Sequence, residues 1–142
     1  IKMAHYAQTV NVIGAIKTTK TAAEMETTGL VLQLYRAKFG QIPLHVEQTF
    51  APLDVAAALT RDGKTLTVGV VNPTTAEVEL NVAVAGVALA GTATRWHITG
   101  PDAFAHNSPG KPRVVDIQRT DTPASMLKVP ALSCSLFELP VR

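Results

Sequence analysis

The spacing of apolar residues changes once along the chain, near Gly40, and this change most limits the possible folds. Before it, residues 28–39 read TGLVLQLYRAKF, in which apolar residues recur at the three- and four-residue steps of a helix. A hydroxyl of Thr27 or Thr28 fits the N-terminal cap, and Gly40 fits a left-handed residue at the C-terminal end. The pattern predicts one amphipathic helix that ends at Gly40.

After Gly40, apolar residues alternate in short segments that are separated by turn signals. The sequence RDGK at 61–64 predicts a hairpin, and NPTT at 72–75 predicts another turn. We expect strands over residues 44–50, 53–59, 66–70, 78–84, 92–99, 113–119, 126–129 and 133–141. About eight short strands of this kind predict a β-sandwich or jelly roll, with a polar loop over 100–112.

The opening residues 4–16 read AHYAQTVNVIGAI and predict a strand, followed by a loop and the helix. One βα unit cannot bury both faces of its strand, so residues 1–40 are expected to belong to a larger α/β body. The chain opens without methionine on the apolar Ile1 and Met3. We therefore expect it to be the back part of a larger protein.

Composition excludes several classes of function. With 142 residues, 46% of them hydrophobic and 17% charged, the chain has the length and character of one globular domain. A scattered net charge of +2 argues against a nucleic-acid partner, and no apolar run is long enough to predict a membrane span. Cys134 is the only cysteine, so no disulfide forms within the chain. No close metal-ligand pair is formed by His5, His45, His97 and His106.

Six motifs occur in a fixed order along nearly the whole chain. They are KMAHYAQTVNVIGAI at 2–16, LYRAKFG at 34–40, DGKTLTVGVVNPT at 62–74, W-x-I-T-G-x-D at 96–102, N-x-P-G-K-P at 107–112 and S-x-S-x-F-E-L-P at 133–140. In this order the chain resembles the C-terminal part of family 51 glycoside hydrolases, the α-L-arabinofuranosidases.

The resemblance implies a mainly β fold. Residues 1–40 would be the last strand and helix of a (β/α)₈ barrel that another chain or fragment completes, and residues 41–142 a C-terminal jelly-roll β-sandwich. It further implies a retaining exo-acting enzyme that needs no cofactor. Both catalytic glutamates would lie on earlier barrel strands, so this chain alone is not expected to be an enzyme. The implied partners are the N-terminal barrel portion, an arabinofuranoside substrate and further copies in a homo-oligomer.

The resemblance also supplies the candidate site. The family's A-Q-x-V-N motif matches residues 7–11, and its glutamine contacts the arabinofuranose, which makes Gln8 the first candidate for substrate binding. Asn11 is expected mainly to bond the loop backbone and is a second candidate. His5 is a third, since His5 and Tyr6 would line the end of the predicted strand.

Other readings remain open on the residues alone. A carbohydrate-binding β-sandwich would need exposed aromatic rings, but Trp96 is the only tryptophan and aromatics make up 5% of the chain. Because Trp96 alternates with Ile98, it is more often a core residue than a sugar platform. A structural module that packs an oligomer is another possibility, as is a different family 51 specificity such as endoglucanase or xylosidase activity.

Overall fold

A computed structural model describes residues 5–6, 8–47 and 50–142 of the chain. Three residues named in the sequence analysis, Ile1, Met3 and Ala7, lie outside the described residues, and so does part of the predicted strand 44–50. Among the described residues, no helix is both long and apolar enough to cross a bilayer.

The described chain is built around an antiparallel sheet of six strands in the order β3-β4-β5-β10-β7-β8. Their bounds are Ile42–Leu44 (β3), Asp54–Leu59 (β4), Thr65–Asn72 (β5), Ser133–Pro140 (β10), Thr92–Thr99 (β7) and Ile117–Pro123 (β8). A separate antiparallel pair is formed by β6 (Val78–Asn81) and β9 (Met126–Val129). The predicted mainly β sandwich is confirmed.

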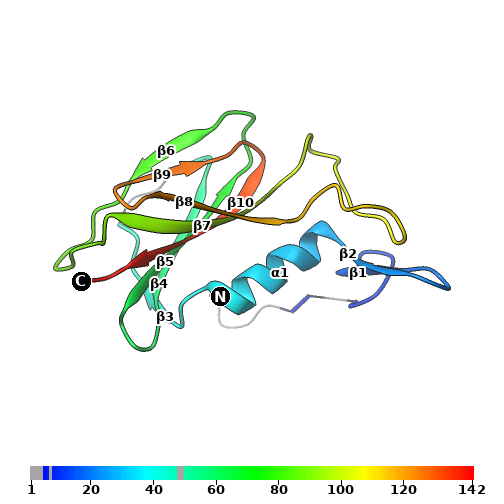
Figure 1. Cartoon of the computed structure of the whole chain (residues 1–142), viewed down its shortest axis with the longest axis horizontal. Helices are drawn as coiled ribbons and strands as arrows, with labels where there is room; N and C mark the ends of the chain where they lie inside the picture. Colours follow the sequence, from blue (N-terminus) through cyan, green and yellow to red (C-terminus); the bar gives the residue numbers. More distant parts are fainter. Residues whose placement is uncertain (1–4, 7, 48–49) are drawn as a thin grey trace.

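The two faces of the six-stranded sheet are covered by different elements (Figure 1). The β6–β9 pair lies over one face and encloses the larger apolar core, in which Val68, Leu127 and Phe137 are almost fully buried. Helix α1 (Thr27–Lys38) lies against the other face, where Leu34 packs with Leu136 in a second core. Alternate residues of β10 therefore serve two cores, because neighbouring side chains of a strand point to opposite faces.

The helix occupies almost the predicted range, but both predicted ends are wrong. The cap is Glu26, whose carboxylate accepts the backbone N–H of Thr27 at 3.0 Å, instead of a threonine hydroxyl. At the other end the extended Phe39 stops the helix, and Gly40 is not left-handed. Gly40 serves a close approach instead, since an added Cβ would lie 2.6 Å from the Leu59 carbonyl oxygen.

The opening strand, which was predicted to end near Gln8, is not found among the described residues 5–6 and 8–15. Residues 8–15 form turns joined by one isolated bridge between Val10 and Ile16, and a short hairpin follows, β1 (Ile16–Thr18) and β2 (Ala23–Met25). A parallel strand forms only by pairing with neighbouring strands. The apolar pattern of the opening residues predicted a strand, but among the described residues no neighbouring strand is present to pair with it.

Most of the remaining strands agree with the pattern after Gly40, but some predicted ranges are wrong. The first strand after Gly40 is β3 at Ile42–Leu44, and the described residues 45–47 after it belong to no strand. The strand predicted over 78–84 ends at Asn81. The predicted hairpin joins β4 and β5, with Gly63 at a φ of 70°. The strand expected over 113–119 begins instead at Ile117, because the backbone N–H groups of Val114 and Val115 both bond to the side chain of Asn107.

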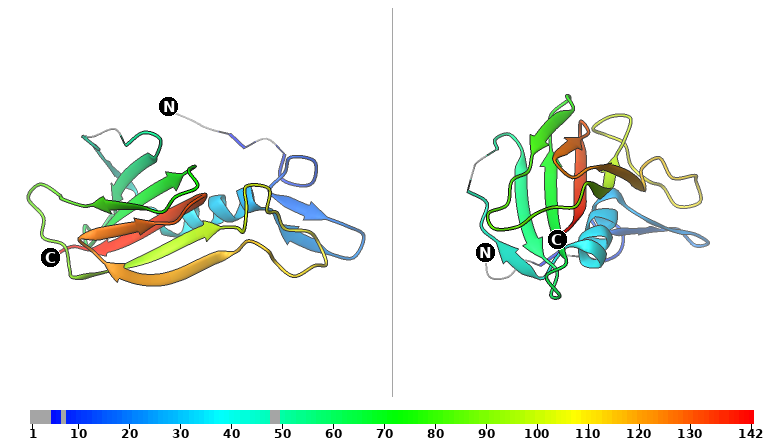
Figure 2. Two further views of the ribbon diagram at one scale, coloured as in Figure 1. Left: turned by 90° about the horizontal axis from the view of Figure 1, so that it is seen from above. Right: turned by 60° about the vertical axis from the view of Figure 1, so that its left-hand side comes forward.

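The predicted polar loop lies against the β1–β2 hairpin at one end of the molecule (Figure 2). Asn107, which is 2% exposed, donates to the carbonyls of Met25 and Val115. Arg113 adds a 2.8 Å ion pair with Glu24, and this hydrogen bond raises the pKa of Arg113 above its ordinary value. The loop and the hairpin are thus joined at the start of α1.

Candidate functional site

The segment before β1 carries the candidate substrate-binding residues and lies beside the start of α1. The Tyr6 hydroxyl donates to the Ile13 carbonyl at 2.8 Å and lies 3.0 Å from the Thr28 hydroxyl. In the turns of this segment Gln8, Asn11 and Val12 have positive φ angles of 61°, 56° and 48°. The left-handed backbone turns the chain sharply, and asparagine tolerates it better than most residues.

Three side chains in this segment were candidates for binding substrate. Gln8 and His5 are exposed, so their polar groups are accessible. Asn11 instead closes the turn, since its carboxamide oxygen accepts the Thr18 N–H at 2.8 Å and its nitrogen donates to the Thr18 hydroxyl at 2.9 Å. Asn11 therefore holds the turn that presents Gln8. Amides of this kind can bond sugar hydroxyls, but they supply neither an acid nor a nucleophile.

Several carboxylates of the described chain are paired with other groups. Glu24 pairs with Arg113, and Glu79 pairs with Lys128 at 3.1 Å and raises the pKa of that lysine. Glu138 accepts the indole N–H of Trp96 at 2.5 Å. Within residues 5–6, 8–47 and 50–142, no group of three or more His, Cys, Asp or Glu side chains could hold a metal ion.

Trp96 contributes to holding the helix on the sheet. Its ring is partly buried, and the Lys38 ammonium lies 4.4 Å from the ring centroid. Lys38 also lies 3.8 Å from the carboxylate of Glu138, which bonds the indole nitrogen. These contacts join the last turn of α1 to β7 and β10. A tryptophan held in this way does not offer a free face for a sugar ring.

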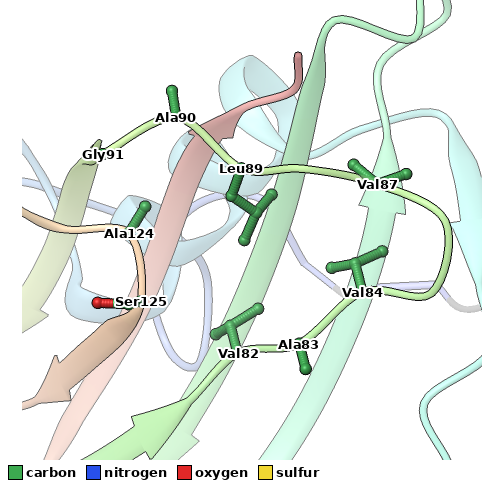
Figure 3. Close-up of a pocket in the computed structure, with 9 residues that line it drawn as sticks. All are labelled: Val82, Ala83, Val84, Val87, Leu89, Ala90, Gly91, Ala124 and Ser125. Carbon is green, nitrogen blue, oxygen red and sulfur yellow. The ribbon is translucent and has the colours of Figure 1, made fainter.

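Two hollows lie outside this segment. The first, of about 390 Å³, is an open hollow between the chain that links β6 to β7 and the turn at Ala124 and Ser125 (Figure 3). Its nine labelled residues are mostly aliphatic, with Ser125 as the single hydroxyl. A sugar site needs several converging polar groups, so this lining does not suit one.

The second hollow, of about 500 Å³, is a groove between α1 and the outer face of β4 and β5; we call it the α1 groove. Its lining includes Leu32, Tyr35, Ala56, Gly69, Val71 and Cys134. This groove was not predicted from the sequence. Leu32 could have indicated a second apolar surface on α1, because it lies outside the apolar stripe that packs against the sheet.

Residues 1–133 match the family model of the alpha-L-arabinofuranosidase C-terminal domain, and the chain belongs to that family. A comparison of the sequence with curated proteins gave no significant match.

Solved structures agree with the family. An alpha-L-arabinofuranosidase from Thermotoga maritima, in complex with arabinose, is 27% identical with a TM-score of 0.80; the match covers 94% of this chain and 33% of that one. The thermostable GH51 alpha-L-arabinofuranosidase from Thermotoga petrophila is 26% identical with a TM-score of 0.78. That match covers 93% of this chain and 32% of the other. The chain thus spans about a third of the length of these relatives.

A more distant structure shares the fold alone. CelM2, a bifunctional glucanase-xylanase from a metagenome library, is 20% identical with a TM-score of 0.59, and the match covers 89% of this chain and 24% of that one. Because the same architecture accompanies different substrates, the fold of this domain does not by itself define the specificity.

Proposed function

We propose that this chain is the C-terminal part of a retaining, exo-acting α-L-arabinofuranosidase. The enzyme would release terminal non-reducing α-L-arabinofuranosyl residues from arabinoxylan, arabinan or arabino-oligosaccharides. The observation that carries the proposal is the family match over residues 1–133, together with the 27% identity to an arabinofuranosidase in complex with arabinose.

In this proposal the chemistry belongs to the N-terminal catalytic portion, and the complete enzyme is that portion joined to this chain. Retaining hydrolysis needs two carboxyl groups about 5 Å apart. One attacks the anomeric carbon, while the other protonates the departing oxygen and then takes a proton from the incoming water. The engagement of Glu24, Glu79 and Glu138 with partners inside this domain supports placing both groups elsewhere.

Gln8 is proposed to bond a hydroxyl of the arabinofuranosyl ring. Its exposed side chain and the turn that Asn11 closes support this role, because the amide is accessible on a hydrogen-bonded turn. The exposed His5 is proposed to lie at the edge of the same pocket. Residues 1–40 would complete the barrel next to the pocket, and residues 41–142 would form the attached β-sandwich.

The test is the Gln8→Ala variant of the complete enzyme, assayed on an aryl α-L-arabinofuranoside. Loss of one hydrogen bond to the sugar, worth about 1 to 3 kcal/mol, lowers kcat/KM by roughly 5- to 150-fold. Thr9→Ala is the matched control, since Thr9 is the exposed neighbour of Gln8 in the same turn. Kinetics for Gln8→Ala equal to those of the control would remove Gln8 from the site.

A further inference from the structure

The α1 groove exists because the helix covers only half of its sheet face. Leu30 and Leu34 pack with Ile98 and Leu136, so the helix lies over β7 and β10. The described residues leave the face of β4 and β5 beside it uncovered, and this face forms the floor of the groove. The groove is therefore a direct result of where the apolar stripe of the helix lies.

The groove is shaped by one glycine and one tyrosine. Gly69 lets the ring of Tyr35 lie against β5, because a Cβ at residue 69 would collide with the Tyr35 hydroxyl. That hydroxyl also lies 3.9 Å from the Cys134 sulfur, and burial is the main cause that raises the pKa of both groups. At the rim, Leu32 is 47% exposed and Val71 is 41% exposed. Exposed apolar rims around a concave floor are typical of interaction surfaces.

We propose that the α1 groove is the docking surface for an apolar segment of the N-terminal catalytic portion, an inference that rests on the proposed function. The chain spans about a third of the length of its relatives, so two thirds of such an enzyme lies outside it. That larger part must lie next to Gln8 if Gln8 is to complete a sugar pocket with it.

The groove lies one helical turn from the contact that α1 makes with residues 5–6 and 8–15, which we call the Gln8 segment. Tyr6 lies against Thr28, and Leu32 follows Thr28 by one helical turn on the same face of α1. Within the Gln8 segment, Val12 and Ile13 are 77% and 64% exposed. A body that covers Gln8 would therefore also cover this apolar face, and burial of these side chains would favour the contact.

The chemistry of the groove argues against a sugar as its occupant. Tyr35 is the only aromatic residue in its lining, and the charged groups there are those of Arg36 and Asp54. Sugar sites combine aromatic faces with several converging hydrogen-bond groups. Aliphatic side chains from another part of the protein fit this surface better.

Cys134 provides a direct measurement of whether the groove is covered. It is the only cysteine of the chain, and trypsin would release it in the peptide of residues 129–142. In the complete enzyme, N-ethylmaleimide should modify Cys134 at least about tenfold more slowly than in the 142-residue chain, because the docked segment must first open. Equal rates in the two proteins would overturn the proposal.

A pair of charge variants tests the same surface within the complete enzyme. Leu32→Glu places a carboxylate on the rim and should raise the modification rate of Cys134 at least about tenfold. Gln33→Glu places the same charge one residue further along the same helix, outside the groove lining, and should leave the rate unchanged. Identical rates in the two variants would contradict docking at this groove.

Two further outcomes separate this inference from the proposed function. If the complete enzyme hydrolyses the arabinofuranoside while Cys134 stays reactive, docking at the groove is wrong and the proposed function stands. If Cys134 is protected but no arabinofuranoside is hydrolysed, docking at the groove stands and the proposed function is wrong. Protection of the 142-residue chain that grows with its concentration, with a dimer seen by sedimentation, would make a second copy the occupant and overturn the proposal.

Discussion

Replacing Asn107 with alanine removes a side chain that uses both ends of its amide. The nitrogen donates to the carbonyls of Met25 and Val115 at 3.2 and 2.8 Å, and the oxygen accepts the N–H groups of Val114 and Val115 at 3.0 Å each. Val114 is exposed, so water can replace that bond. Val115 is 4% exposed, and its N–H and carbonyl would each lose a partner in a buried position.

The expected loss follows from these four bonds. A typical buried hydrogen bond contributes about 1 kcal/mol net, and a buried group left without a partner costs about 1 to 3 kcal/mol. We expect Asn107→Ala to lower the free energy of unfolding by about 3 to 4 kcal/mol. With an m value of about 2 kcal/mol/M, the urea midpoint falls by roughly 1.5 to 2 M.

The assay is urea unfolding followed by the fluorescence of Trp96, the only tryptophan in the chain. Gln41→Ala is the matched control, because this exposed amide also bonds two backbone groups, the Phe39 carbonyl and the Arg61 N–H. Water replaces those bonds, so the control should lose about 1 kcal/mol or less. A loss for Asn107→Ala no larger than that of the control would refute the reasoning.

Other variants test the packing and the electrostatics of the domain. Leu34→Ala, in the core under α1 where Leu34 is 2% exposed, should cost about 2 to 4 kcal/mol by urea unfolding; a loss below about 1 kcal/mol would show that the helix is not firmly packed. Burial, followed by the charge of Arg95, lowers the pKa of His97 below 6.5, so the folded state favours the neutral ring. Stability should be complete above pH 6.5 and fall as the pH decreases, since the unfolded state binds the proton more readily; His97→Gln should show a flatter pH profile, and an unchanged slope would contradict this. Arg113→Ala removes exposed ion pairs with Glu24 and Asp116 and should cost about 1 kcal/mol or less in the same assay, and a larger loss would show that these pairs order the loop.

The parts of the fold that local patterns determine were predictable from the sequence. The hairpin of β4 and β5 followed from alternation around a tight turn, and the helix followed from its apolar repeat. The later start of β8, at Ile117 instead of residue 113, was not predictable in the same way. There Val115 packs into the core from a loop, while the polar edge strand β8 carries almost no alternation.

Features that depend on distant partners were not predictable. Gly40 looked like a helix cap, but its role is set by the Leu59 carbonyl beside it. The α1 groove depends on the position of the helix across the sheet, which no local pattern gives. Among the candidate site residues, the sequence indicated that Asn11 bonds the loop backbone, and the structure adds Thr18 as its partner. The roles of Gln8 and His5 in binding substrate stay predictions.

The proposed retaining hydrolysis can be followed in the reaction of the complete enzyme with 4-nitrophenyl α-L-arabinofuranoside, with the first-formed sugar observed by proton NMR. We expect hydrolysis in which the arabinose first appears with the anomeric configuration of the substrate, while the 142-residue chain alone is inactive. Failure of the folded complete enzyme to hydrolyse this substrate, or hydrolysis by this chain alone, would show that the proposed function is wrong.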